Sequence, residues 1–266
     1  MQNDSRSGAI PFLMYHEIEL PGRELSRDFK GHIPYVVPHN ELHSQLQFLH
    51  DNGWRGLTVT DALADSGNSG QKVAVTFDDG SETDLYAAAL LHDAGLRATF
   101  YVIVGWLGRP GYLSPGQIRE LHASGFEIGC HSMNHRYLSG LSDRELQIEL
   151  AHSKARLEEM LGTVIHHFSC PGGFWDSRVA RVAKEFGYRS VSTSRIGRNT
   201  QDSDRYRLSR ICIMRGMRVE GFNSACRGKR LFLKQARERI TAVPKAVLGA
   251  NLYIRLTVAL RSHEGE

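Results

Sequence analysis

The chain has 266 residues, of which 41% are hydrophobic and 23% charged, and its formal net charge is +4. This is the length and composition of an ordinary globular α/β domain, and no repeat or low-complexity tract interrupts it. No apolar run reaches the 20 or so residues of a membrane-spanning helix, and residues 1–8 lack a signal-peptide pattern, so we expect a cytoplasmic protein.

The positive charge is concentrated at the C-terminus. Residues 227–266 carry nine Lys/Arg against three Asp/Glu, and the rest of the chain is close to neutral. Such a basic segment is typical either of peripheral contact with an anionic membrane or of a solvated helix face, and both readings stay open. The four cysteines form no C-x-x-C pair, which favours free thiols in a reducing compartment.

Short apolar runs alternate with helical patterns along the chain. In chain order we expect a strand over 10–15, a helix over 40–52, a strand over 72–77, a helix over 83–94, a strand over 98–104, a helix from 114, strands over 126–130 and 167–169 with a helix over 142–161 between them, a helix over 177–186, and strands over 188–192 and 208–213.

This alternation predicts a parallel sheet covered by helices, and six to eight strand–helix units favour a distorted (β/α) barrel over an open sheet. We therefore expect an α/β barrel domain over residues 1–228 and a basic helical C-terminal extension over 229–266. In such barrels the functional side chains follow the carboxyl ends of the strands. The residues after each predicted strand are accordingly the candidates for a site.

The strand over 72–77 is followed by Asp78, Asp79 and Gly80. Two adjacent carboxylates at the end of a buried strand resist joint ionisation unless a cation or hydrogen-bond donors stabilise them. Gly80 permits the sharp turn that would direct both side chains into one site. Read alone, the same triplet is also compatible with a solvated turn.

The strand over 126–130 is followed by His131 and His135, which are spaced so that both can face one point. Two imidazoles and a carboxylate suit Zn²⁺, with Co²⁺ and Ni²⁺ as alternatives, and three protein ligands leave a position open for water. A His pair at this spacing is commonly structural. The metal hypothesis therefore rests on both clusters following strands at the same edge of the sheet.

Two further loops are candidates for catalysis. Pro171 and Gly172 follow the strand over 167–169, and a backbone N–H there could stabilise an oxyanion, although an ordinary turn fits equally well. His16 ends the first strand, and imidazole has an ordinary pKa near neutrality, as a general acid requires.

Together these residues resemble the polysaccharide deacetylases with a NodB homology domain, carbohydrate esterase family 4, over about residues 10–213. Residues 76–80 (Thr-Phe-Asp-Asp-Gly) match the first family motif and residues 131–135 (His-Ser-Met-Asn-His) match the second. The resemblance implies that Asp79, His131 and His135 bind the metal and that Asp78 is the general base.

The third family motif, Arg-x-Pro-(Phe/Tyr)-Gly, is altered. Ser169 stands in place of the arginine that orients the catalytic Asp, and Gly172 stands in place of the aromatic residue. The C-terminal Leu-x-His motif is absent, but residues 11–16 resemble a permuted subgroup that includes poly-N-acetylglucosamine deacetylases, which implies that His16 is the acid. Arg207 and Arg210 also resemble that subgroup, as ion-pair partners or as site residues.

The resemblance implies a metal-dependent hydrolase that removes N-acetyl groups from a sugar or polysaccharide, with an acetylated carbohydrate as partner and no nucleic acid. Three alternatives are open: hydrolysis of another C–N amide, a non-catalytic carbohydrate-binding protein, and a membrane-docked factor of polysaccharide assembly. The altered third motif favours the second alternative, and the basic C-terminal segment favours the third.

Overall fold

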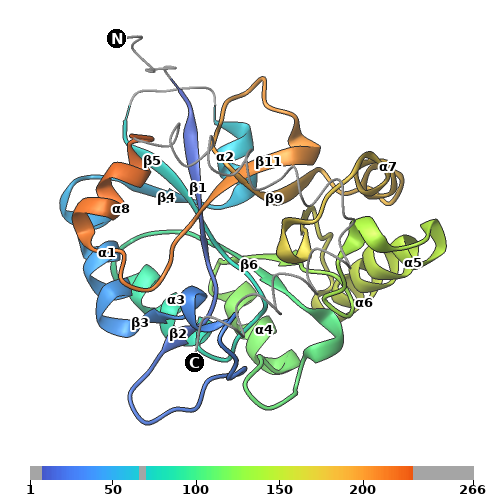
Figure 1. The fold of residues 1–266 in the computed structure, drawn as a ribbon, viewed down its shortest axis with the longest axis horizontal. Helices are drawn as coiled ribbons and strands as arrows, with labels where there is room; N and C mark the ends of the chain where they lie inside the picture. Colours follow the sequence, from blue (N-terminus) through green and yellow to red (C-terminus); the bar gives the residue numbers. More distant parts are fainter. Residues whose placement is uncertain (1–7, 66–69, 230–266) are drawn as a thin grey trace, which may run out of the picture.

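The structure is a computed structural model that describes residues 8–65 and 70–229 (Figure 1). Except for Lys229, the expected C-terminal extension and its basic charge lie outside the described residues. In the part of the chain that is described, no helix is long and apolar enough to cross a membrane. The four cysteines are free thiols, as predicted.

Seven parallel strands of the described chain close into a barrel. The pairing order is β1–β11–β9–β8–β7–β6–β5, and β5 pairs with β1 to complete the circle. The predicted (β/α) barrel is thus confirmed, with fewer than eight strands in the ring. The strands are β1 (Ile10–Tyr15), β5 (Lys72–Phe77), β6 (Thr99–Val102), β7 (Glu127–Cys130), β8 (His167–Ser169), β9 (Ser190–Ile196) and β11 (Leu208–Cys212).

Two short strands extend this ring at its edges. β4 (Arg55–Leu57) pairs in parallel with the first half of β5, and β10 (Arg198–Asn199) pairs antiparallel with the start of β1. A separate pair, β2 (Ile18–Glu19) and β3 (Val37–Pro38), follows β1. None of these four strands was predicted, because two or three residues are too few to show an alternating pattern.

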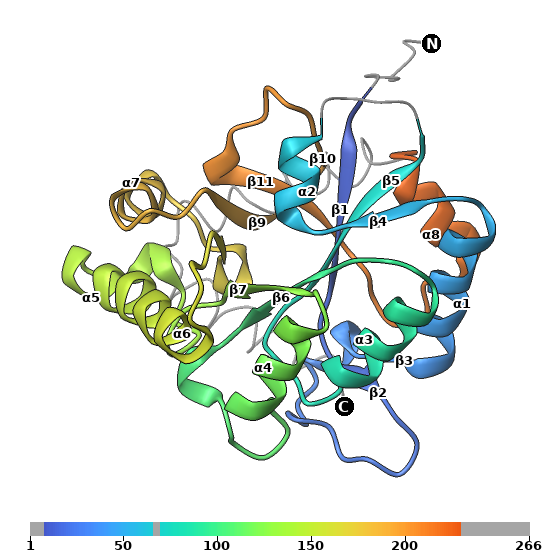
Figure 2. The same cartoon turned by 180° about the vertical axis from the view of Figure 1, so that it is seen from behind.

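Helices surround the strands, as the two opposite views show (Figures 1 and 2). They are α1 (His39–Asp51), α3 (Asp84–Asp93), α4 (Pro115–Ala123), α5 (Asp143–Gln147), α6 (Ser153–Leu161), α7 (Ser177–Glu185) and α8 (Val219–Cys226), with the shorter α2 (Val59–Ala64). Capping boxes at Ser114 and Ser142 begin α4 and α5, at the two positions where the sequence predicts a helix to start. The short helices α2 and α8 were not predicted.

Alternate residues of the strands face opposite sides, as the period of two requires. Leu13 in β1 and Val75 in β5 belong to the large core between strands and helices, whereas Phe12 and Ala74 belong to a smaller core inside the barrel. Tyr101 of β6 also lies in the inner core, and Gly129 of β7 leaves room for it. A Cβ atom at that glycine would lie 2.4 Å from the tyrosine ring.

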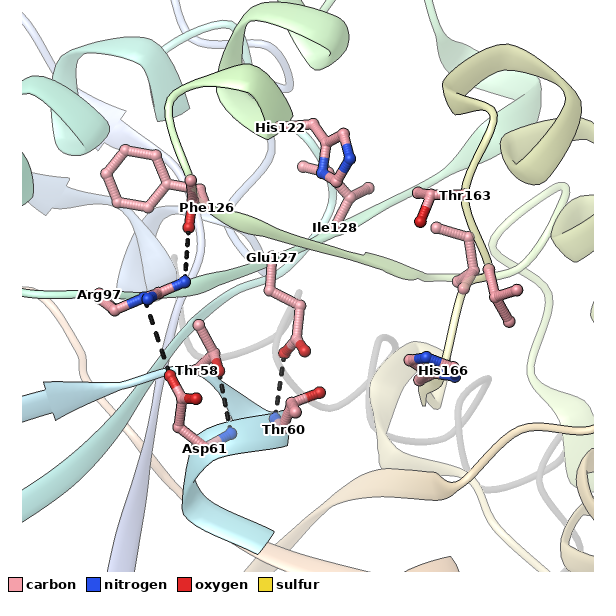
Figure 3. A pocket seen from close by; sticks show the side chains of 13 residues that line it. Thr58, Thr60, Asp61, Arg97, His122, Phe126, Glu127, Ile128, Thr163 and His166 are labelled. Carbon is pink, nitrogen blue, oxygen red and sulfur yellow. Dashed lines mark hydrogen bonds and ion pairs between the residues drawn. The ribbon is translucent and has the colours of Figure 1, made fainter. Parts of the chain in front are cut away.

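The first residues of three strands, Thr99, Glu127 and His167, are polar and contact α2 or each other at the amino end of the barrel. The Glu127 carboxylate accepts hydrogen bonds from the backbone of Val59 (3.0 Å) and from the Thr99 hydroxyl (2.5 Å). His167 lies 2.8 Å from the Thr60 hydroxyl. A pocket of about 320 Å³ opens beside these contacts (Figure 3). The charged groups there serve the packing of α2.

Candidate active site

The predicted site residues meet at the opposite end of the barrel, where the parallel strands finish. His16 follows β1, Asp78 and Asp79 follow β5, His131 follows β7, and Ser169 is the last residue of β8. Because the strands run in parallel around a closed ring, these positions share one rim. The fold thus brings together residues that are up to about 150 positions apart.

Three side chains form a compact group of metal-ligand type. Asp79, His131 and His135 each offer one ligand atom, and these atoms lie within 4.8 Å of one another. The Asp79 Oδ1 atom is 3.4 Å from His131 Nε2 and 3.2 Å from His135 Nε2. Burial opposes the charge on Asp79, but His131, His135 and Arg27 hold the pKa of its carboxyl well below its usual range. The carboxylate is therefore ionised at neutral pH.

One hydrogen bond fixes the orientation of the His131 ring towards Asp79. His131 Nδ1 lies 2.8 Å from the Ser169 carbonyl oxygen, which can only accept, so Nδ1 carries a proton and the neutral imidazole directs its Nε2 lone pair towards Asp79 Oδ1 and towards a metal. The Asp79 Oδ1 atom is buried and has no hydrogen-bond partner among the described residues. Facing lone pairs repel unless a cation lies between them, so these residues fit a divalent metal.

The backbone around the group is in an uncommon conformation. Within the described chain, positive φ angles at non-glycine residues occur at Asp79 (83°), Ser132 (69°) and His135 (57°) and nowhere else. Two of the three are proposed ligands, and the third lies between the two histidines. Such conformations cost about 1–3 kcal/mol each and persist where the surroundings enforce them, which is characteristic of functional sites.

A buried glutamate enforces the conformation of the histidine loop. Glu149 accepts hydrogen bonds from the backbone of Met133 (2.9 Å) and of Asn134 (2.8 Å). It lies in a π-helical turn, Ile148–His152, between α5 and α6, where the sequence predicts one continuous helix. The wider turn marks a departure from regular helix of the kind often found near functional sites. On the other side of the loop, Gly105 donates its backbone N–H to the Met133 carbonyl (2.9 Å).

The Asp78 carboxylate accepts three hydrogen bonds from two residues. Arg210 of β11 donates to Oδ1 and to Oδ2, each at 2.7 Å, and the Ser169 hydroxyl donates to Oδ2 at 3.0 Å. Burial raises the pKa of Asp78, but Arg210 and His131 lower it, with a net shift below its usual value. Arg210 thus supplies the positive charge that the altered third motif lacks. The sequence left open whether Arg210 is an ion-pair partner or a site residue, and the structure shows that it is the ion-pair partner of Asp78.

His16 lies close enough to Asp78, Asp79 and Arg210 for their charges to affect its pKa. Burial lowers the pKa of its imidazole to about 4, although Asp79 and Asp78 act to raise it. Its Nδ1 atom is buried and has no hydrogen-bond partner among the described residues, and its ring lies 5.1 Å from that of Tyr35. The ordinary imidazole pKa assumed from the sequence is therefore wrong for this site. His16 is neutral at neutral pH in the metal-free protein.

The loop after β8 is a tight turn, Pro171–Gly173, in which Gly172 has a φ angle of 60°. A Cβ atom at Gly172 would lie 2.7 Å from the Tyr137 ring, and that ring packs on Phe174 with centroids 4.4 Å apart. The family motif has its aromatic residue at Gly172, and here Tyr137 and Phe174 place aromatic rings beside it. The role of the Gly172 N–H towards an oxyanion stays a prediction.

Arg27 contacts Asp79 Oδ2, although no pattern in the sequence marks it as a site residue. It lies in the irregular segment between β2 and β3, 52 positions before its partner. Its guanidinium also lies over the Trp106 ring, 5.6 Å from the centroid. A lone arginine in a loop gives no sequence signal, so only the folded chain reveals the contact.

Comparison with known proteins agrees with this geometry. The family model described as polysaccharide deacetylase matches residues 65–191. YxkH of Bacillus subtilis, which bears the name of a polysaccharide deacetylase, is 31% identical over 221 residues, covering 81% of this chain and 75% of that protein. A peptidoglycan-N-acetylglucosamine deacetylase of Bacillus cereus is 33% identical over 126 residues, and the match spans 47% of this chain and 57% of the relative.

Solved structures have the same fold. A deacetylase of Streptococcus pyogenes in complex with acetate superposes with a TM-score of 0.71 at 26% identity, over 82% of this chain and 98% of that one. A polysaccharide deacetylase of Bacillus cereus gives a TM-score of 0.73 at 26% identity, over 82% and 69% of the two chains. Since the likeness to YxkH extends over three quarters of that relative, this chain belongs to the polysaccharide deacetylase family.

Proposed function

We propose that the chain is a metal-dependent hydrolase that removes N-acetyl groups from an N-acetylated sugar or polysaccharide. The observation that carries the proposal is the unpartnered Asp79 Oδ1, which faces the two histidine nitrogens beside the ionised Asp78. Relatives named for chitooligosaccharide and peptidoglycan substrates support a carbohydrate amide as the substrate class.

The three ligands would be Asp79, His131 and His135, and Zn²⁺ suits this set best, with Co²⁺ and Ni²⁺ as alternatives. A metal held there would supply Lewis acidity and would lower the pKa of a water from about 16 towards roughly 7. Asp79 and His131 are buried at the rim of the barrel, and His135 is partly exposed.

Two residues of the chain move protons in this scheme. Asp78 accepts the proton of the attacking water, and the two-point contact with Arg210 keeps its carboxylate ionised and fixed in orientation. His16 donates a proton to the leaving amine. Because the imidazole is neutral at rest, it would first receive the proton that Asp78 took from the water, so that one proton passes from the water through Asp78 and His16 to the amine. The Gly172 N–H and Pro171 would lie beside the acetyl oxygen.

The test is the release of acetate from acetylated glucosamine oligomers, measured with and without a chelator. The proposal predicts release that stops on chelation and returns when Zn²⁺ is restored. Zinc-dependent hydrolysis of a small cyclic amide, with no acetate from the oligomers, would favour another C–N amide instead. Binding of the oligomers without turnover would show a carbohydrate-binding protein, against which the complete Asp78–Arg210 pair argues.

A second proposal concerns the basic segment over 229–266, which we propose makes peripheral contact with anionic membranes. Its nine-to-three excess of basic residues, counted from 227, supports this contact. Removing residues 229–266 should weaken sedimentation with vesicles that contain anionic lipid. Equal sedimentation of the full and the shortened chain would refute the contact.

A further inference from the structure

A loop over residues 20–32, which we call the capping loop, is tied to a buried carboxylate next to the site. Glu17 is 1% exposed and accepts hydrogen bonds from the Ser26 backbone (2.7 Å), the Ser26 hydroxyl (2.6 Å) and Arg23 (3.1 Å). The His32 ring nitrogen lies 2.9 Å from the same carboxylate. Four contacts from one loop to one carboxylate fix the path of the loop.

A second attachment fixes the other side of the capping loop. Gly111, with a φ angle of 83°, lies so close that a Cβ atom there would be 2.9 Å from Ser26 Cα. Arg23 also reaches Glu82 at 3.2 Å. Ser26 is thus held between Glu17 and Gly111, and the next residue, Arg27, is directed at the site.

Arg27 connects two of the proposed metal ligands. Its guanidinium contacts Asp79 Oδ2 and lies 5.6 Å from the centre of the Trp106 ring. The Trp106 ring in turn contacts the ring of His135, with the two ring centroids 5.5 Å apart. The Arg27 side chain is 21% exposed, so the pair with the buried Asp79 is partly shielded from water.

We propose that Arg27 is the positioning residue of the metal-binding carboxylate, an inference that rests on the metal site of the proposed function. A carboxylate can rotate to present either oxygen. The guanidinium holds Oδ2, and this leaves Oδ1 directed at His131 and His135. Groups that orient a ligand in this way commonly change metal affinity about ten- to hundredfold when they are removed. The capping loop therefore sets how tightly the site binds its metal.

The test measures zinc affinity of the metal-free full chain by competition with a chromophoric chelator, with no substrate present. Arg27→Gln should weaken Zn²⁺ binding about ten- to hundredfold. Arg27→Lys should bind Zn²⁺ with intermediate affinity, because lysine keeps the positive charge but lacks the planar guanidinium with its paired N–H donors. Glu17→Gln should release the capping loop and so weaken zinc binding through the Arg27–Asp79 contact. Adding Glu17→Gln to Arg27→Gln should therefore lower the zinc affinity little further.

Arg109→Gln is the matched control. Arg109 lies over the same Trp106 ring at 5.8 Å and is exposed, so its loss removes a nearby positive charge and leaves the Asp79 contact intact. Zinc affinity should not change in this variant, and thermal melting should show that each variant is folded. Equal or tighter binding by Arg27→Gln would overturn the inference. Zinc binding by the unaltered chain without acetate release would refute the proposed function alone.

Discussion

Arg210 and Asp78, 132 residues apart in the sequence, are joined by two hydrogen bonds of 2.7 Å at the rim of the barrel. Arg210 is fully buried, and its remaining donors reach the Thr193 carbonyl and the Ser169 hydroxyl. Ser169 occupies the position of the family arginine, so a small hydroxyl there leaves space for a guanidinium that comes from β11. The orienting charge is retained, although its place in the sequence has changed.

The first prediction concerns this pair. Arg210→Lys should lower kcat by about a hundredfold or more, because an ammonium cannot make the two parallel hydrogen bonds that fix the carboxylate. Zinc content should be unchanged, since Arg210 contacts none of the three proposed ligands in the described structure. Acetate release and metal analysis on the same sample check both. Full activity would show that Asp78 needs no fixed orientation.

Asp78→Asn should separate chemistry from metal binding. The amide has nearly the shape of the carboxylate but cannot accept the proton of water, so acetate release should fall by a factor on the order of 10² to 10⁴. Asp79→Ala is the contrasting variant and should lose the metal itself, as should His131→Ala. Mass spectrometry of the native proteins measures the bound metal. Normal turnover by Asp78→Asn would rule out its role as base.

His16 should titrate far below an ordinary histidine. Burial lowers the pKa of its imidazole to about 4, so its NMR signals in metal-free protein should shift near pH 4 and stay constant around pH 6.5. His16→Ala should also lower kcat by about a hundredfold or more. A midpoint at or above 6.5 would contradict the buried and unpartnered position of the Nδ1 atom.

Glu127 should make the fold sensitive to acid. Burial opposes its charge, but contacts with His167, Thr60 and Thr99 lower its pKa to about 2, below the unfolded value near 4.5. A lowered pKa stabilises the fold above pH 4.5, and this stabilisation is lost as the pH falls towards 2. Glu127→Gln should cost on the order of 3 kcal/mol at pH 7 and little near pH 2. Urea unfolding at several pH values measures the difference.

Asp84 should show the opposite behaviour. It is fully buried, both of its carboxylate oxygens have no hydrogen-bond partner in the described structure, and burial together with Asp79 and Glu17 raises its pKa well above the usual value. A raised pKa favours the fold at low pH, and this contribution is lost as the pH rises. Asp84→Asn should therefore raise the melting temperature of metal-free protein at pH 8, with a smaller gain at pH 4. A loss of stability at pH 8 would show that the charged form is preferred.

The sequence alone determined the barrel and the triad of candidate ligands. The strand over 72–77 was predicted to the residue because β-branched side chains, a flanking turn and a following Asp-Asp-Gly leave little choice of register. Parallel strands then place whatever follows them on one rim, so Asp79, His131 and His135 could be grouped before any coordinates existed. Local pattern and one topological rule were sufficient to group the two histidines with the Asp78–Asp79 pair, and the resemblance to the deacetylase family implied that Asp79 is the ligand of the two carboxylates.

Only the tertiary structure decided what surrounds the triad. Arg27 and Arg210 reach Asp79 and Asp78 across 52 and 132 residues, and no local pattern encodes a partner at such a distance. The pKa of His16 likewise depends on how completely the folded chain excludes water from its ring. Periodicity reports which face of an element is buried, whereas charge pairing and desolvation depend on which elements come to lie side by side.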